Sequence, residues 1–182
     1  MKLVAIVGMT GAGKSEVSRL FEKAGFIRIR FGDITDVEVR KRGLELNEEN
    51  ERRVREALRK EHGMAAYALL NLSRIDLAIK QQDVVVDGLY SWEEYVMLKS
   101  YYRDRLITLA VWSSPQTRYA RLAAREVRPL TAEEAASRDR SEVENLHKAG
   151  PIAMADYTIL NESSLKDLAR ETKAAIAAIR KK

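Results

Sequence analysis

Residues 8–15 constrain this chain more than any other part of its sequence. They read Gly-Met-Thr-Gly-Ala-Gly-Lys-Ser, follow the apolar run Leu3–Val7, and open a helical pattern over residues 15–24. A strand, a glycine-rich turn and a helix in this order point backbone N–H groups and a helix N-terminus at one spot, which suits a phosphate. The pattern therefore predicts a phosphate-binding loop, or P-loop, inside an α/β fold.

Residues of this loop have distinct expected roles. Lys14 is placed to reach the β- and γ-phosphates of a nucleotide, and Ser15 is placed to bind Mg²⁺. The residues expected to bind the nucleotide here are Gly8, Gly11, Ala12, Gly13, Lys14, Ser15 and Glu16.

The bulk composition is that of a single globular domain of 182 residues, with 46% hydrophobic and 32% charged residues. There are no cysteines, no apolar run long enough to span a bilayer, and no segment that reads as a signal peptide. We therefore expect a cytoplasmic protein that does not use a membrane. The net charge is +5, but basic and acidic residues alternate along the chain, as in residues 48–53. This interleaving argues against a nucleic-acid partner.

Apolar runs alternate with helical patterns along the whole chain. Strands are expected at Leu3–Val7, residues 26–31, Val84–Asp87, Leu106–Trp112 and Tyr157–Leu160. Helices are expected at residues 15–24, 34–42, 48–61, 64–80, 91–102, 115–124, 131–147 and 163–179. This alternation predicts a three-layer P-loop NTPase fold, with a five-stranded parallel sheet, helices on both faces and a small helical lid. Ligands bind such sheets at the carboxyl ends of the strands.

Two carboxylates follow expected strands and so lie at that edge. Asp87 ends the run Val84–Asp87 and is expected to hold Mg²⁺ directly or through water, although Asp-Gly is also a common turn. Asp33 follows the second strand and is expected to orient an acceptor hydroxyl or accept its proton. The alternative for Asp33 is the N-cap of the next helix, since Asp is a preferred cap.

Arginines gather between residues 118 and 140. Three of them, Arg118, Arg121 and Arg125, are spaced to share a helical face, and Arg suits phosphate recognition. A break at residues 128–130 separates two Arg-rich helices, which predicts a lid that folds over the nucleotide. The alternative is that these arginines form salt bridges with nearby acidic residues.

Taken together, these residues resemble the nucleoside monophosphate kinase group of P-loop proteins. The resemblance is to the archaeal-type adenylate-kinase-related proteins and, more distantly, to dephospho-coenzyme A kinases. It covers nearly the whole chain and rests on an ordered set of motifs. These are residues 8–15, Gly32-Asp33, residues 84–88 followed by Ser91, Ser114-Pro115 with Arg118 and Arg121-Leu122, Arg138-Asp139-Arg140 with Glu142, and Ala155-Asp156-Tyr157 with Ile159 and Asn161. The resemblance implies that Lys14, Ser15 and Asp87 handle Mg-ATP, that Arg121 and Arg125 flank its base and phosphates, and that Asn161 lies near the adenine.

The chain departs from adenylate kinases at two positions. Adenylate kinases carry an arginine where this chain has Asp36, and another at the end of the Asp-Gly run, near Tyr90 and Ser91. Both of those arginines grip the acceptor phosphate, and losing such a contact costs about 1.5–3 kcal/mol. Arg40, one helical turn after Asp36, is a candidate substitute.

The leading hypothesis is an ATP- and Mg²⁺-dependent kinase that transfers the γ-phosphoryl group to a nucleotide or nucleotide-like small molecule. Lys14, Arg125 and Arg138 would stabilise the transferring group, and Asp33, Arg40 and Arg140 would bind the acceptor. The acceptor region is expected at about residues 33–81 and the lid at about residues 125–147. The alternatives are phosphorylation of a hydroxyl, as in dephospho-coenzyme A kinases, and a nucleotide-binding regulator with little transferase activity.

Overall fold

Five short strands form one parallel sheet in the computed structural model, which describes residues 1–181. Their order across the sheet is β2-β3-β1-β4-β5, and each neighbouring pair is parallel. The strands are β1 (Leu3–Val7), β2 (Ile27–Arg30), β3 (Val84–Asp87), β4 (Leu106–Trp112) and β5 (Tyr157–Leu160). Because all of them run in one direction, their carboxyl ends meet at one edge of the sheet.

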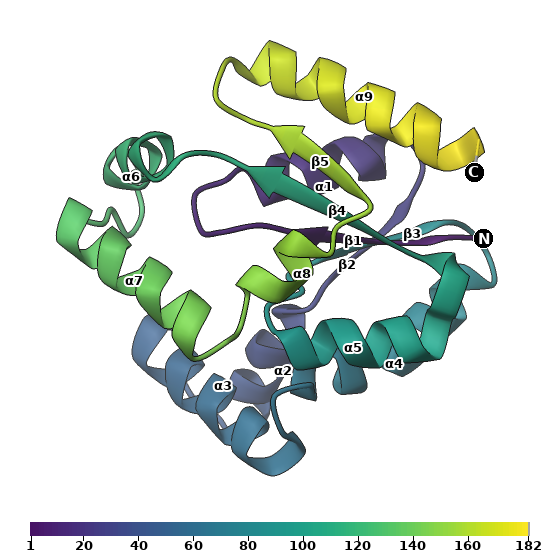
Figure 1. Cartoon of the computed structure of the whole chain (residues 1–182). Helices are drawn as coiled ribbons and strands as arrows, with labels where there is room; N and C mark the ends of the chain where they lie inside the picture. The colour runs from purple at the N-terminus through teal and green to yellow at the C-terminus, as the bar shows by residue number, and fades with distance from the viewer. Residues whose placement is uncertain (182) are drawn as a thin grey trace.

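Helices cover both faces of this sheet (Figure 1). Leu3, Ala5 and Val7 of β1 pack into one core, and the alternate residues Val4 and Ile6 pack into a second core on the other face. The run is apolar throughout because a strand covered on both faces needs an apolar side chain at every position. The covering helices are α1 (Lys14–Lys23) and α9 (Leu165–Lys181) on one face, and α4 (Ala66–Ile79), α5 (Trp92–Tyr102) and α8 (Ala149–Ala153) on the other. The three-layer α/β fold is confirmed. Within residues 1–181, no helix combines the length and the apolar character that crossing a bilayer requires.

Two helical arms extend from the carboxyl edge of the sheet. The α2–α3 arm consists of α2 (Asp33–Lys41) and α3 (Glu48–His62), and the α6–α7 arm consists of α6 (Pro115–Ala123) and α7 (Ala132–Glu144). Figure 1 shows α7 beside α3. Arg128, in the turn between α6 and α7, pairs with Glu48 at 2.6 Å and with Glu51 at 3.5 Å. These ion pairs join the two arms.

The helix expected over residues 131–147 is shorter than predicted, and a separate helix, α8, follows it. The first helix, α7, stops at Glu144 because the chain turns at His147, which takes the left-handed conformation with φ of 51°, before α8 begins. Ser91 and Thr131 cap α5 and α7, since each side chain accepts the backbone N–H group three residues on. A short 3-10 turn, η1 (Arg103–Arg105), also links α5 to β4.

Candidate functional site

The loop between β1 and α1 has the backbone shape of a phosphate site. Gly8 and Gly13 adopt positive φ angles of 145° and 100°, and Gly13 is the N-cap of α1. A Cβ at Gly13 would overlap the Asn161 side-chain nitrogen. Glycine is therefore required there for two reasons, the positive φ angle and the lack of space. Asn161 Nδ2 donates to the Ala12 carbonyl at 2.8 Å and supports the loop from β5. Asn161, expected near the adenine, thus contacts the loop itself.

Lys14 folds back over this loop. Its Nζ atom donates to the Met9 carbonyl at 3.0 Å. Burial, together with the nearby ammonium of Lys148, lowers the pKa of Lys14 to about 7, while Glu142 and Asp87 act in the opposite direction. An incoming phosphate would therefore meet a lysine that gains its full charge on binding.

Asp87 stands at the end of β3 beside the loop. Its Oδ2 atom accepts from Ser18 Oγ at 2.9 Å and from the Arg28 guanidinium at 2.5 Å. Its Oδ1 atom has no hydrogen-bond partner within residues 1–181. Ser15 is exposed nearby, at the start of α1. One free carboxylate oxygen and one hydroxyl fit Mg²⁺, which keeps several waters and takes the remaining ligands from phosphates.

A buried ion pair reaches the loop from the α6–α7 arm. Glu142 Oε2 accepts from the Thr10 backbone N–H at 3.2 Å and from Lys148 Nζ at 2.8 Å, and Glu142 Oε1 accepts from the Thr10 hydroxyl. Lys148 is 1% exposed and lies 5.1 Å from the centre of the Tyr90 ring. Burial alone would raise the pKa of Glu142, but Lys148 and the Thr10 hydroxyl outweigh it and hold the pKa at about 2. Glu142 is therefore ionised at neutral pH.

Two arginines of the α6–α7 arm, Arg118 and Arg121, are engaged in hydrogen bonds within the protein. Arg118 is buried and binds Asp139 through two hydrogen bonds of 2.7 and 2.6 Å. Arg121 donates to Ser113 Oγ at 3.1 Å and to Asn161 Oδ1 at 3.4 Å. The expectation that Arg125 shares their helical face is wrong, because α6 ends at Ala123 and Arg125 lies in the following turn. Arg118 thus holds α6 to α7.

A cavity of about 650 Å³ opens between the two arms, beside the loop. Its walls carry more positive than negative side chains. They include Arg30, Arg55, Arg59, Arg125, Arg128 and Arg138, with Asp36, Glu48, Glu51 and Glu142 as the acids. We call it the acceptor cavity. The cavity meets the phosphate-binding loop at Glu142. This residue lines the cavity and accepts a hydrogen bond from Thr10 of the loop.

Three arginines of the acceptor cavity are left with unused hydrogen-bonding capacity. Arg59 lies over the Tyr67 ring at 5.4 Å, and among residues 1–181 neither Arg59 nor Arg125 forms an ion pair. Arg138 approaches Glu142 at 3.6 Å, which is longer than a good hydrogen bond. Arg55, by contrast, is engaged with the carboxylates of α3.

Other sequence-predicted residues lie elsewhere. Arg40 is exposed on α2 and does not line the acceptor cavity. Asp33 is the first residue of α2 and not its cap, which is Gly32; its carboxylate pairs with Arg74 at 3.3 Å and with Arg30 at 3.5 Å. Asp33 does not line the cavity, although its partner Arg30 does. Glu16 forms a half-exposed pair on α1 with Arg19.

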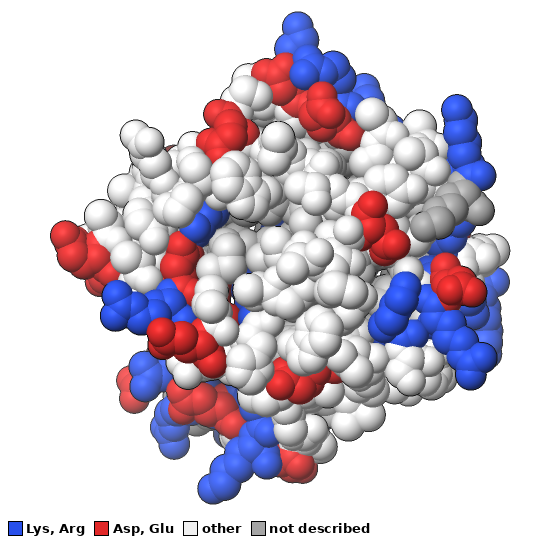
Figure 2. All heavy atoms as spheres, viewed as in Figure 1, with Lys and Arg blue, Asp and Glu red and all other residues white. Residues whose placement is uncertain are grey.

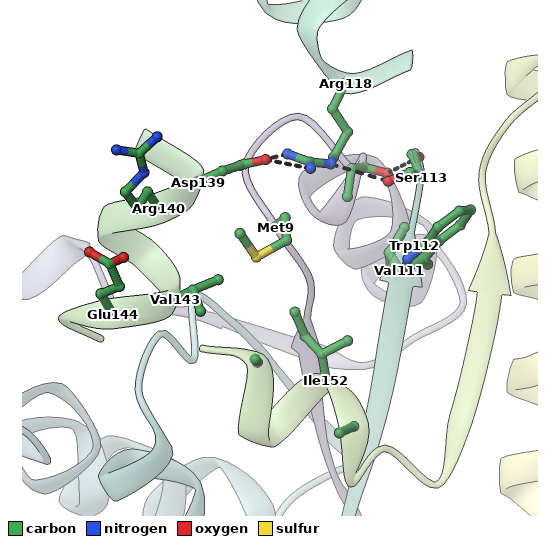
Figure 3. Close-up of a pocket in the computed structure, with 13 residues that line it drawn as sticks. Met9, Val111, Trp112, Ser113, Arg118, Asp139, Arg140, Val143, Glu144 and Ile152 are labelled. Carbon is green, nitrogen blue, oxygen red and sulfur yellow. Dashed lines mark hydrogen bonds and ion pairs between the residues drawn. The ribbon is translucent and has the colours of Figure 1, made fainter. Parts of the chain in front are cut away.

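A second cavity of about 540 Å³ lies between α7, α8 and the end of β4. Figure 3 shows Met9, Val143 and Ile152 around it and the Arg118–Asp139 pair at its edge. Arg140 and Glu144 of α7 also line this second cavity. Arg140 is therefore on this side of α7 and not in the acceptor cavity, where Arg138 is found, because residues two apart face opposite sides of a helix.

One face of the molecule carries interleaved charges, as the sequence does. On the face drawn in Figure 2, Lys and Arg side chains stand beside Asp and Glu around an uncharged centre. This face shows no continuous positive surface of the kind that follows a nucleic-acid backbone.

Several residues of the site were missed by reasoning from sequence: Thr10, Ser18, Arg28, Arg59 and Lys148. Arg28 could have been found from the sequence. Residues 27–30 alternate isoleucine with arginine, which indicates a strand with one apolar face and one charged face. Thr10 and Ser18 have partners far away in the chain, Glu142 and Asp87. Lys148 pairs with Glu142 six residues before it, across the turn that separates α7 from α8.

The fold and the site define a P-loop kinase-like domain. This chain belongs to the UPF0200 family. It is 38% identical over 175 residues to a UPF0200 protein of Thermococcus kodakarensis, covering 94% of each chain, and 36% identical over 169 residues to one of Methanococcus maripaludis, covering 92% of this chain and 91% of that one. The model of an AAA domain matches residues 4–145.

Solved structures share the fold. A shikimate kinase from Bacteroides thetaiotaomicron superposes with a TM-score of 0.63 at 13% identity, covering 98% of each chain. A gluconokinase from Sinorhizobium meliloti gives a TM-score of 0.60 at 17% identity, covering 98% of this chain and 93% of that one. At these identities the likeness concerns the fold alone.

Proposed function

We propose that this protein is a kinase that uses Mg-ATP to phosphorylate a small molecule bearing an anionic group, such as a nucleotide or a nucleotide-like compound. The observation that carries the proposal is the acceptor cavity, which holds an excess of arginines and meets the phosphate-binding loop at Glu142. A P-loop that adjoins a cationic cavity brings a phosphoryl donor and an anionic acceptor together.

The donor side follows from the loop. Loop N–H groups and Lys14 would bind the β- and γ-phosphates, and Ser15 and Asp87 would hold Mg²⁺, which neutralises phosphate charge when it is bound. Ser18 and Arg28 keep the Asp87 carboxylate in place. Arg121, Arg125 and Asn161 remain candidates for contacts with the rest of the nucleotide.

On the acceptor side, other arginines would take the place of the two that the adenylate kinase resemblance leads one to expect. Asp36 and Tyr90, the residues found at or near those positions, both line the acceptor cavity. Arg59 of α3 faces the same cavity with no ion-pair partner in residues 1–181, so it would bind the acceptor anion, with Arg125 and Arg138 opposite. Asp33 would orient the acceptor through Arg30, or act on a hydroxyl directly if the acceptor resembles dephospho-coenzyme A.

The second candidate is a nucleotide-binding regulator with little transferase activity. Asp36 and Tyr90 favour it, because neither supplies a positive charge to an acceptor phosphate. It differs from the kinase in one measurable respect, since it would bind ATP without phosphorylating any acceptor.

The test is incubation with Mg-ATP and a panel of acceptors, with products read by phosphorus NMR. The panel contains AMP, CMP, UMP, GMP, deoxynucleotides, nucleosides and dephospho-coenzyme A. A product that is lost in Lys14→Ala and kept in Lys173→Ala, an exposed lysine of α9, would support the kinase. Nucleotide binding without any product would favour the regulator.

Once an acceptor is known, Arg59→Ala tests the acceptor side. Losing a charged hydrogen bond costs about 1.5–3 kcal/mol, so the KM for the acceptor should rise by about ten-fold or more. The KM for ATP should stay unchanged. Arg53→Ala, an exposed arginine on the same helix, is the matched control. An equal effect of both variants would remove Arg59 from the acceptor site.

A further inference from the structure

The carboxylate of Glu142 occupies a position that is built for an anion. In a P-loop, backbone N–H groups donate to phosphate oxygens. Here the Thr10 N–H and hydroxyl both donate to Glu142, a residue 132 positions away on the α6–α7 arm. The protein therefore places one of its own anions where the loop offers donors to a ligand.

One oxygen of this carboxylate links the loop to Lys148. Glu142 Oε2 lies 3.2 Å from Thr10 N and 2.8 Å from Lys148 Nζ. A phosphate oxygen in the same place would contact both groups without any movement of the loop or of α8. The geometry thus puts the Lys148 ammonium within reach of a phosphate bound at Thr10.

The charges around this point also favour a ligand anion. Three cationic groups gather here. Lys148 and Arg138 lie beside the Glu142 carboxylate, and both lower the pKa of the nearby Lys14. Burying an ammonium and a carboxylate together carries a large desolvation cost, and apolar residues of similar size would pack as well. A cation retained at this cost beside a phosphate-binding loop has a further use there.

The position also indicates which phosphate is involved. Glu142 and Arg138 line the acceptor cavity, while Lys148 lies directly behind Glu142. The phosphate nearest the acceptor is the one to be transferred, which is the γ-phosphate of ATP.

We propose that Lys148 is a second phosphate-binding lysine that contacts the γ-phosphate of the bound nucleotide, and that Glu142 fills this position in the nucleotide-free protein. The proposal rests on the proposed function for its nucleotide and for the side of the loop on which an acceptor would bind. It assigns Glu142 the role of an internal competitor, which a triphosphate displaces and a diphosphate leaves in place.

Calorimetry tests this with two probes, the β,γ-imido analogue of ATP and ADP, each with Mg²⁺. Lys148→Met should weaken binding of the triphosphate analogue about ten-fold or more and change ADP binding by less than three-fold. Glu142→Gln should tighten binding of the triphosphate analogue about ten-fold, because the competing charge is gone. Glu144→Gln, two residues further along α7 and exposed, and Lys173→Met should leave both affinities unchanged.

Two further measurements guard against a folding defect. The double variant Glu142→Gln/Lys148→Met leaves no unpaired buried charge and should fold, yet bind both probes with similar affinity. In the wild-type protein, the ¹⁵N-labelled Thr10 amide signal should shift on addition of the triphosphate analogue and much less with ADP.

The proposal is overturned if Lys148→Met changes both affinities equally or neither, or if Glu142→Gln weakens the triphosphate analogue. Lys148 would then be a structural ion-pair partner of Glu142. These outcomes are separate from the kinase test, since they concern nucleotide binding and need no acceptor.

Discussion

Glu94→Gln should stabilise this protein at alkaline pH and much less at acidic pH. Glu94 is fully buried at the start of α5, where its Oε2 atom accepts from the Tyr90 N–H at 2.7 Å and weakly from the Ser91 N–H at 3.4 Å. Its Oε1 atom is buried with no hydrogen-bond partner among the described residues. Burial raises the pKa of Glu94 from 4.5 to about 7, against the opposing effects of these hydrogen bonds, Arg59 and Lys148.

The size of the effect follows from proton linkage. The folded protein holds the Glu94 proton more tightly than the unfolded chain, so this group favours folding below pH 4.5 relative to neutral pH. That contribution is lost as the pH rises through about 7. A shift from 4.5 to about 7 corresponds to roughly 3 kcal/mol. Gln keeps the capping geometry without a charge to bury.

Urea unfolding followed by circular dichroism at pH 5, 6, 7 and 8 measures this difference. The gain in unfolding free energy of Glu94→Gln over wild type should grow by about 2–3 kcal/mol between pH 5 and pH 8. Glu49→Gln, at an exposed position of α3, should show no such trend. A difference that stays flat with pH, or that is largest at pH 5, would refute the argument from burial.

Four other variants or measurements test separate parts of the structure. Gly13→Ala should cost at least about 2 kcal/mol of stability, since it adds a steric overlap to a left-handed backbone; unfolding within 0.5 kcal/mol of wild type in urea would contradict this. Arg118→Met should cost about 3–5 kcal/mol by leaving Asp139 unpaired and largely buried, and adding Asp139→Asn should recover much of the loss in the same assay. Arg128→Ala should cost less than about 1 kcal/mol, and this small effect should vanish in 1 M NaCl, because its ion pairs are exposed. Nucleotide binding at pH 7.5 should take up protons as phosphate raises the pKa of Lys14, which calorimetry in buffers of different ionisation enthalpy detects; equal heats in all buffers would exclude it.

Local rules account for the parts of the fold that the sequence predicted. The run Leu3–Val7, the glycine turn and α1 are adjacent in the chain, so steric and capping preferences define them without knowledge of the rest. The capping boxes at Ser91 and Thr131 are equally local, since each joins residues three positions apart. The end of α7 was missed, because nothing in a polar helical pattern required the left-handed turn at His147.

The site was predicted less well because its contacts join distant segments. Arg28 and Asp87 are 59 residues apart, and they meet because β2 and β3 are neighbours in the sheet, an order that hydrophobic patterns do not specify. Thr10 and Glu142 meet through the fold of the α6–α7 arm. Spacing along one helix placed Arg125 wrongly, since it assumed that α6 continues beyond Ala123.

The alternation of Ile and Arg in β2 has a consequence for association between molecules. β2 lies at an outer edge of the sheet, where unpaired backbone groups offer a template for a strand from another chain. It is four residues long, and two of them are Arg28 and Arg30. A short edge with a positive charge at every second residue is a poor template for aggregation. The arginines that pair with Asp87 and Asp33 therefore also protect the sheet against the addition of a foreign strand.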